Sequence, residues 1–232
     1  MPQAAQVNSM FASIAGRYDL ANRTLSLGID NYWRRILVRK VAECNPRTVA
    51  DLATGSGDVA IALRRGLDKG ISLEGLDFCE PMLVQARAKA GQAGFSQDEL
   101  SFRTGDCLDL PLGDNSVDCL TIAFGLRNFQ DRRKGLQEML RALAPGGSLH
   151  ILEFSQPCAW FRPFYFLYLK AILPTAACIL TGNRSAYQYL GDTIEAFPGK
   201  QGLAAEIRDA GFAKVTVQGL TASVVAIHSA FK

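Results

Sequence analysis

The stretch DLATGSGDVAIAL, residues 51–63, decides the fold, because it has the pattern of a strand that turns into a helix. Asp51 ends a short apolar run, two glycines follow with one residue between them, and an apolar segment of helical character comes next. Gly55 and Gly57 let the backbone approach a ligand closely, and the first turn of the helix offers N–H groups without intrahelical partners. This arrangement predicts a site for a nucleotide-like ligand.

Apolar runs alternate with helical patterns from residue 48 onward. Strand-like runs lie at 48–53, 71–78, 100–106, 117–124 and 148–154. The segments between them space their apolar residues at helical intervals, and the Pro-Gly-Gly at 145–147 is expected to end the third helix before its strand begins. The alternation predicts parallel strands joined by right-handed crossovers, and therefore an open α/β sheet.

The C-terminal end has a different pattern. Residues 205–212 have the pattern of a helix that ends at Gly211, and 214–220 and 223–231 have the pattern of two strands only two residues apart. Because a gap this short excludes a crossover, the two strands are expected to form an antiparallel hairpin. Residues 6–44, ahead of the sheet, look helical with a break at Gly28.

The composition is that of one globular domain. With 232 residues, of which 48% are hydrophobic and 20% charged, the chain can bury a full core and lies outside the disordered range. The net charge of +3 is spread along the chain, and the densest basic cluster, 132–134, is interpreted as a solvated helix start. No nucleic-acid partner is therefore expected.

The cysteines point to a reducing compartment. The six positions, 44, 79, 107, 119, 158 and 178, show no Cys-x-x-Cys motif and no metal-type spacing with the two histidines, so no bound metal is expected. Several lie in apolar runs, where a free thiol behaves as a small core residue. The N-terminus lacks a basic region followed by a long apolar core, so the location is predicted to be cytoplasmic.

Apolar and aromatic residues dominate the segment 158–182. Arg162, Pro163, Lys170 and Pro174 interrupt it and leave no run of about 20 apolar residues, so a membrane span is not expected. Two interpretations stay open. The segment can form core or lid helices around an apolar substrate, or it can dock on the surface of a membrane, which suits aromatic residues mixed with Arg and Lys.

Two ligands fit the glycine turn. GSGDVA has the form G-x-G-x-x-A, and Asp77, 20 residues after Gly57, can accept hydrogen bonds from the ribose of a nicotinamide dinucleotide or of S-adenosylmethionine. Asp58 at the helix start would repel a pyrophosphate, whereas a sulfonium ligand would tolerate it. Asp106, after the third strand-like run, can accept from an adenine amino group. Together these features favour the methyl donor.

The chain resembles the UbiE-type C-methyltransferases of ubiquinone and menaquinone biosynthesis nearly from end to end. The stretches that carry the resemblance are FASIAGRYDLANRTLSLGIDNYWRR (11–35), FGLRNFQD (124–131), LAPGGSLHILEFSQP (143–157), YQYLGDTIEAFPG (187–199) and AGFAKVTVQGLTASVVAIH (210–228). The chain departs from the usual motifs at Ala21, where Met is usual, at Asp30, where His is common, and at 142–144, where Val-x-Lys is usual. The first two departures lie in the segment that covers the active site in this family.

The resemblance implies a class I methyltransferase fold: a mostly parallel, Rossmann-like, seven-stranded α/β sheet that ends in an antiparallel hairpin strand and carries helices on both faces. It implies a single domain over 1–232, with an N-terminal helical lid at 1–46 and an apolar helical insertion at 158–198. S-adenosylmethionine would then contact Asp51, Gly55 and Gly57 at its methionine end, Ser56 in the turn, Asp77 at the ribose, Asp106 and Cys107 at the adenine, and Ala123 at the end of the fourth strand.

For the acceptor, the resemblance implies a prenylated quinol that is methylated at a ring carbon. Because a phenol has a pKa near 10, a base or a cation must favour the phenolate before that carbon becomes nucleophilic. Arg127, just past the fourth strand, can do this directly or through a water, or it can pair structurally with Glu153 or Asp131. The further catalytic candidates, all on the lid, are Tyr18, Asp19 and Asn22. Direct methyl transfer then depends mainly on positioning and desolvation.

Several alternatives stay open. His150, inside a strand, is interpreted as a core residue, whereas His228 can face either the site or the core. Demethylmenaquinol is the first acceptor and the 2-polyprenyl-6-methoxy-1,4-benzoquinol precursor of ubiquinone the second. A nicotinamide-dependent oxidoreductase and a catalytically silent donor-binding module are the other classes. The partners expected are the quinol, the surface of a membrane and a second copy of the chain.

Overall fold

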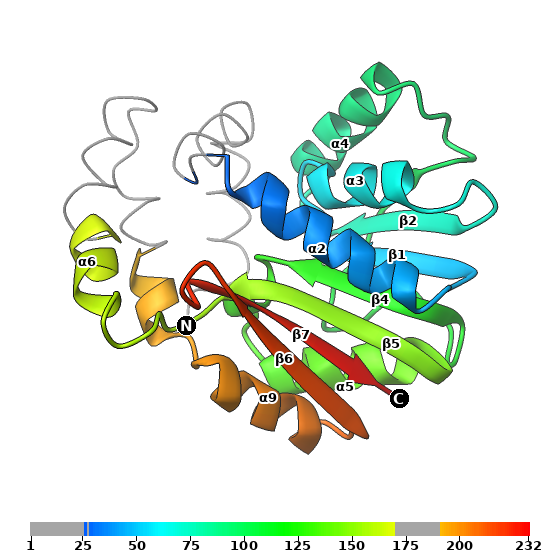
Figure 1. Ribbon diagram of the computed structural model, residues 1–232. Helices are drawn as coiled ribbons and strands as arrows, with labels where there is room; N and C mark the ends of the chain where they lie inside the picture. Colours follow the sequence, from blue (N-terminus) through cyan, green and yellow to red (C-terminus); the bar gives the residue numbers. More distant parts are fainter. Residues whose placement is uncertain (1–25, 27, 170–190) are drawn as a thin grey trace.

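A computed structural model describes residue 26, residues 28–169 and residues 191–232 (Figure 1). The strands are β1 (Thr48–Leu52), β2 (Ser72–Asp77), β3 (Ser101–Thr104), β4 (Val117–Ala123), β5 (Leu143–Phe154), β6 (Lys214–Leu220) and β7 (Val225–Phe231). The helices are α2 (Asp30–Glu43), α3 (Asp58–Gly66), α4 (Glu80–Gln92), the 3₁₀ turn η1 (Leu126–Asn128), α5 (Arg132–Ala142), α6 (Arg162–Leu167) and α9 (Lys200–Asp209).

These strands form one sheet in the order β3-β2-β1-β4-β5-β7-β6. Strands β1 to β5 run parallel, and β7 lies antiparallel between β5 and β6. Helices α2, α3 and α4 cover one face of the sheet, and α5 and α9 cover the other (Figure 1). The predicted fold class is therefore confirmed.

The central strands supply apolar residues to both faces of the sheet. In β1, Val49 packs in the core beneath α2, α3 and α4, whereas Ala50 and Leu52 pack in the core beneath α5 and α9. Because successive side chains of a strand point to opposite faces, a strand covered on both sides needs a continuous apolar run. This explains why the sequence pattern identified these strands.

The Pro-Gly-Gly segment lies within β5 rather than ahead of it, so that prediction is wrong. Leu143, directly after α5, already pairs with Val117, and the register then shifts so that Ser148 pairs with Cys119. Residues 144–147, which lie opposite the single residue Asp118 of β4, form an irregular segment in which Gly146 has a φ of +78°. Glycine adopts this conformation without strain, so the segment bulges without ending the strand.

The predicted C-terminal hairpin is confirmed, although its turn is longer than predicted. Strand β6 has the predicted bounds, but β7 begins at Val225. Thr221, Ala222 and Ser223 have φ values of 48°, 52° and 63°, so they cannot continue a strand. The preceding helix also differs, because α9 begins at Lys200, directly after Gly199 and ahead of the predicted 205–212.

Some predictions lie outside the described residues, namely those on Tyr18, Asp19, Asn22 and Cys178. Of the predicted lid, α2 is described, and it begins two residues after the predicted break at Gly28, which has a φ of +75°. No described helix is both long and apolar enough to span a membrane. In the same part of the chain, no three His, Cys, Asp or Glu side chains are grouped so as to hold a metal ion.

Candidate active site

A cavity of about 200 Å³ lies at the carboxyl ends of β1, β2 and β4. The strand order reverses between β1 and β4, and the crevice outside such a switch point is where open α/β sheets bind ligands. The lining residues are Ala53, Gly55, Asp77, Phe78, Cys79, Met82, Asp106, Cys107, Leu108, Ala123, Phe124, Gly125, Asn128, Phe129 and Gln130. The cavity thus brings together five of the predicted donor residues: Gly55, Asp77, Asp106, Cys107 and Ala123.

The two glycines of the turn have different tasks. Gly55, with a φ of +56°, lines the cavity and donates its N–H to Asp77 Oδ2 at 2.8 Å. Gly57 has a φ of +83°, and a Cβ atom there would lie 2.9 Å from Ala86 Cβ. Gly57 is therefore needed to pack the turn against α4, and it does not line the cavity.

Asp77 is one of two acids that line the cavity, the other being Asp106. Its carboxylate accepts the N–H groups of Gly55 and, at 2.9 Å, Cys79. Burial raises the pKa of this carboxyl group, against the effect of those hydrogen bonds. A carboxylate has about four acceptor positions, so it can still accept from the hydroxyls of a ribose. The predicted role of Asp77 fits its position.

Asp51 lies beneath the turn and does not line the cavity. It is 1% exposed, and the hydroxyls of Thr54 and Thr121 each donate to it at 2.6 Å. Burial raises its pKa to about 6, although these two hydrogen bonds oppose the rise. Among the described residues, Asp51 therefore stabilises the glycine turn through its hydrogen bonds with Thr54 and Thr121.

Ser56 and Asp58 face α4. Lys89 lies 3.2 Å from Ser56 Oγ and also hydrogen-bonds to Asp58, which pairs with Arg34 at 3.3 Å as well. Ser56 does not line the cavity. Two cations, Lys89 and Arg34, neutralise Asp58, so the prediction that Asp58 would repel a pyrophosphate no longer follows. The preference for S-adenosylmethionine over a nicotinamide dinucleotide therefore depends on Asp77, Asp106 and the family.

The far wall of the cavity suits an adenine ring. Asp106 is exposed, and it accepts the N–H of Leu108 at 2.8 Å. Cys107 is buried, and burial raises the pKa of its thiol to about 12, so the thiol stays protonated. Phe78, Met82 and Leu108 add apolar surface that the sequence analysis missed. A polar acceptor beside apolar walls is what a flat, amino-bearing ring needs.

Two residues without glycine's freedom are strained at the cavity. Ala53, after β1, has a φ of 48°, and Phe124, after β4, has a φ of 57°. A Cβ at Gly125 would lie 2.7 Å from Ala53 Cβ, so the two segments approach closely. Backbone strain of this kind persists only where its surroundings enforce it, and it is concentrated at functional sites.

Arg127 does not line the cavity. Its Nη1 lies 2.8 Å from Glu153 Oε1 and also donates to the carbonyl oxygen of Phe124. The side chains of Arg127 and Glu153 are only 6% and 1% exposed, and the guanidinium lies over the Phe154 ring at 5.2 Å. Its buried Nε has no partner among the described residues. Of the two roles left open for Arg127, this geometry shows the pairing with Glu153.

Both histidines are core residues. His150 is buried in β5 with Nδ1 at 2.9 Å from Ser229 Oγ, and burial lowers its pKa to about 4, as expected for a neutral core imidazole. His228 Nε2 lies 2.7 Å from the carbonyl oxygen of Lys200 in α9, and burial lowers its pKa as well. Neither lines the cavity, so for His228 the packing alternative is the one observed.

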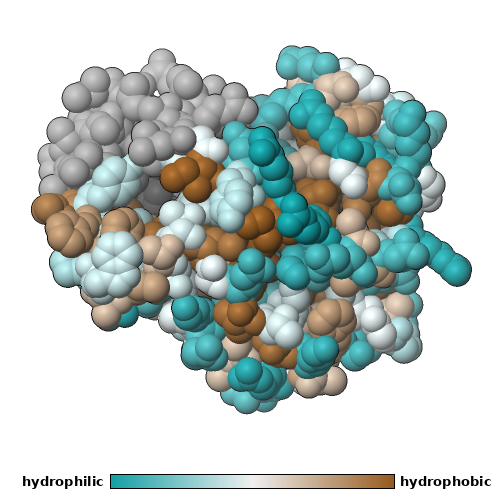
Figure 2. All heavy atoms as spheres, viewed as in Figure 1, coloured by the Kyte–Doolittle hydropathy of each residue, from teal (hydrophilic) through white to brown (hydrophobic). Residues whose placement is uncertain are grey.

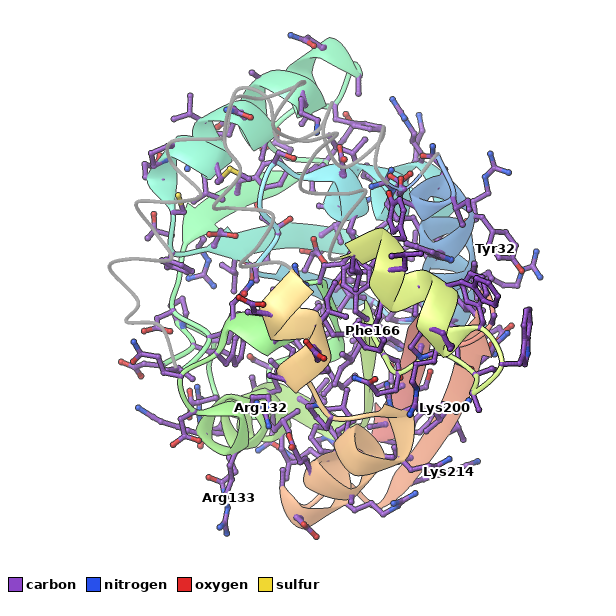
Figure 3. All side chains as sticks on the ribbon, turned by 90° about the vertical axis from the view of Figure 1, so that its left-hand side faces the viewer. Tyr32, Arg132, Arg133, Phe166, Lys200 and Lys214 are labelled. Atoms are coloured by element: carbon purple, nitrogen blue, oxygen red, sulfur yellow. The ribbon has the colours of Figure 1, made fainter. Side chains whose placement is uncertain are left out.

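The basic cluster at the start of α5 is only partly solvated. Arg133 projects into solvent (Figure 3), as predicted. Arg132 instead forms two 2.8 Å hydrogen bonds with Glu206 of α9 and lies 5.5 Å from the centre of the Phe197 ring. The interpretation as a wholly solvated helix start is therefore wrong for Arg132.

A larger cavity, of about 590 Å³, lies at the opposite edge of the sheet, where β1 and β4 begin. Lys40, Cys44, Asp118, His150 and Lys214 are among the residues that line it. It is open and lies at the amino ends of the parallel strands, away from the glycine turn. The smaller cavity is the better candidate, because it joins the turn, the acids and the apolar walls.

Comparison with known proteins identifies the family. The sequence profile of the ubiE/COQ5 methyltransferase family matches residues 2–232. A demethylmenaquinone methyltransferase of Thermus thermophilus is 45% identical over 94% of this chain and 98% of its own length. A ubiquinone/menaquinone biosynthesis C-methyltransferase UbiE of Rickettsia felis is 40% identical over 97% and 92%. A SAM-dependent methyltransferase from Aquifex aeolicus has the same fold, with a TM-score of 0.59, 19% identity and coverage of 80% and 81%.

Fold and site together define a class I methyltransferase, a class whose methyl donor is S-adenosylmethionine. Within this class, the chain belongs to the ubiE/COQ5 methyltransferase family. The cavity fits the donor, since Gly55, Asp77 and Asp106 offer a close backbone approach and two acceptors beside apolar walls.

Proposed function

We propose that the protein methylates a ring carbon of a prenylated quinol, with demethylmenaquinol as its first acceptor and the benzoquinol precursor of ubiquinone as its second. One observation carries the proposal. The cavity at the carboxyl ends of β1, β2 and β4 joins the donor-type acids Asp77 and Asp106 to an apolar wall that continues through Phe124 and Phe129. The names of the Thermus and Rickettsia relatives support the quinol as acceptor.

The residues of the cavity divide the work of binding. S-adenosylmethionine supplies an electrophilic methyl group when it is bound. Asp77 would accept hydrogen bonds from the ribose, Asp106 would accept from the adenine amino group, and Gly55 and Ala123 would leave room for the donor. Asp51, Ser56 and Gly57 act indirectly, because they hold the turn in place. Phe78, Leu108 and Phe129 supply apolar surface at the cavity, where bound donor and acceptor would cover them and displace water. Tyr18, Asp19 and Asn22 remain predicted contacts of the acceptor.

The prenyl tail requires an apolar environment, and α6 offers one. Trp160, Phe164 and Leu167 are 71%, 66% and 61% exposed, whereas Tyr165 is buried and anchors the helix. Apolar side chains gather at the edge of the molecule where α6 lies (Figure 2). We also propose that the surface formed by Trp160, Phe164 and Leu167 rests on a membrane. The quinol ring could then reach the site while its prenyl tail stays among the lipids.

The membrane contact has its own test. A variant with Trp160, Phe164 and Leu167 all changed to Ala should lose co-sedimentation with vesicles of anionic lipid. Val84→Ala, which removes an exposed apolar side chain of α4, should retain it. Equal binding by both variants would refute the contact. A triple variant that instead converts a dimer to a monomer in light scattering would identify the face as a subunit interface.

The main experiment compares acceptors. The protein is incubated with isotope-labelled S-adenosylmethionine and either reduced demethylmenaquinone or the reduced ubiquinone precursor, and kcat/KM is measured for each. The proposal expects transfer to a quinol, with the higher kcat/KM for demethylmenaquinol. Transfer to neither, with the donor shown to bind, would refute it and support a silent donor-binding module.

A further inference from the structure

Phe124, in the cavity wall, is constrained in both its backbone and its side chain. Its backbone has a left-handed φ of 57°, its N–H donates to the carbonyl oxygen of Leu152 at 2.8 Å, and it lines the cavity. Its ring lies 6.0 Å from the ring of Trp33 in α2 and 4.9 Å from the ring of Phe154 in β5. The side chain is thus held between two elements, while the backbone needs a separate restraint to stay left-handed.

Arg127 and Glu153 supply that restraint. The Arg127 guanidinium donates to the carbonyl oxygen of Phe124 and to Glu153 Oε1. The same carboxylate accepts the backbone N–H of Arg127 at 3.3 Å and that of Phe154 at 2.8 Å. The buried carboxylate therefore holds Arg127 against β5, and the guanidinium of Arg127 in turn holds the carbonyl group of Phe124. Removing Arg127 would take away the hydrogen bond to the Phe124 carbonyl oxygen, and removing Glu153 would take away the carboxylate that holds the guanidinium in place for it.

The electrostatics favour this role over direct contact with the acceptor. A phenolate that approached the guanidinium would have to compete with the Glu153 carboxylate, which is already 2.8 Å away and almost fully buried. The two negative charges would repel one another in a poorly screened environment. The pair is close to neutral as a whole, so it is suited to hold a backbone carbonyl rather than to stabilise an anion.

We propose that Glu153 and Arg127 are positioning residues, which keep Phe124 in its left-handed conformation and thereby fix the cavity wall at the end of β4. This deepens the proposed function, because the wall is shared by the donor and the quinol ring. Neither residue needs to touch a substrate.

A double-mutant cycle with Phe124 tests the proposal. Glycine adopts a left-handed φ without strain, so the Phe124→Gly background no longer needs the restraint. Arg127→Ala should lower kcat/KM and donor affinity by about tenfold in the parent, which corresponds to ~1.4 kcal/mol. In the Phe124→Gly background the same change should lower them less than about threefold, since the strain that the restraint opposes is gone. An equal loss in both backgrounds would overturn the proposal, because Arg127 would then act independently of the Phe124 backbone.

The chain offers a matched control. Arg132 is also paired with a glutamate and also lies over a phenylalanine ring, but its hydrogen bonds go to Glu206, whereas those of Arg127 include one to the carbonyl oxygen of Phe124. The effects of Arg132→Ala and Phe124→Gly should therefore add without coupling. If Arg132→Ala couples to Phe124→Gly as strongly as Arg127→Ala does, the coupling reflects general destabilisation and the proposal fails.

Two further variants guard against misfolding. Arg127→Lys keeps a positive charge beside Glu153 and should retain part of the donor affinity, and Phe124→Asn is a second residue type that tolerates a left-handed φ. Donor affinity, measured by calorimetry on folded protein, needs no acceptor. Coupling in donor affinity without any methyl transfer by the parent protein would support the positioning role and refute the quinol acceptor. Methyl transfer to the quinol by the parent protein, without coupling between Arg127 and Phe124, would support the quinol acceptor and refute the positioning role.

Discussion

Asp51 carries a carboxyl group that the fold buries almost completely, so its replacement by asparagine should make stability less sensitive to pH. Burial raises its pKa from 3.8 to about 6, and the hydrogen bonds from Thr121 and Thr54 only partly oppose this rise. Because the folded pKa lies above the unfolded one, folding favours the protonated form. The stabilising contribution is therefore complete below about pH 4 and is lost as the pH rises through about 6.

The size of the effect follows from the shift. A change of one pKa unit corresponds to about 1.4 kcal/mol, so the full shift is worth roughly 3 kcal/mol, of which about 2.5 kcal/mol falls between pH 4 and pH 7.5. The asparagine side chain cannot ionise, and the hydroxyls of Thr54 and Thr121 can rotate to donate to its carbonyl or accept from its amide. Asp51→Asn should thus gain stability relative to the parent by that amount over this interval.

Urea unfolding of both proteins at several pH values between 4 and 7.5 measures the difference. Other titrating groups are common to the two proteins, so their contributions cancel. Thr121→Val removes a hydrogen bond that opposes the shift, so its pH dependence should be steeper than that of the parent. Parallel profiles for the parent and Asp51→Asn would refute the reasoning.

Three further predictions follow from the same structure. Gly57→Ala should lower the free energy of unfolding by ~3 kcal/mol and Gly94→Ala by only ~1 kcal/mol. Both glycines have a left-handed φ, but only at Gly57 would the new Cβ atom meet a neighbour, Ala86 Cβ at 2.9 Å. Equal losses in urea unfolding would contradict this prediction. Asp77→Ala should weaken S-adenosylmethionine binding by about 10- to 100-fold in calorimetry, as for the loss of hydrogen bonds to a charged group, with unchanged affinity as the contrary result. Glu206→Gln, which breaks a partly exposed pair with Arg132, should cost less than ~1 kcal/mol in thermal unfolding, and a loss above ~2 kcal/mol would show that the pair matters more than its exposure suggests.

The sequence was most informative where burial imposes a simple pattern. Strands β1 to β4 were predicted to within one or two residues. For the central strands β1 and β4 the reason is burial on both faces, which needs a continuous apolar run. Strand β6 was predicted with its observed bounds. The start of β5 was predicted wrongly. Pro-Gly-Gly has the pattern of a helix stop, but the strand already begins at Leu143, which pairs with Val117 of β4.

The site was only partly predictable. Gly55, Asp77 and Asp106 follow directly from strand ends, where a parallel sheet gathers its functional residues. The pairing of Arg127 with Glu153 depends on two neighbouring strands and joins residues 26 positions apart, so no local pattern selects it over Asp131. The left-handed φ of Phe124 had no sequence signal, because such strain comes from tertiary contacts rather than from residue type.

A single-turnover experiment tests the central claim most directly. The protein is loaded with one equivalent of methyl-labelled S-adenosylmethionine and mixed with excess reduced demethylmenaquinone, and the products are fragmented in a mass spectrometer. We predict one label on a ring carbon of the quinol for each donor consumed, and a large loss of that transfer in Asp77→Ala. A label on a ring oxygen, or a donor that stays bound and intact, would contradict the assignment of this cavity as the active site of a quinol C-methyltransferase.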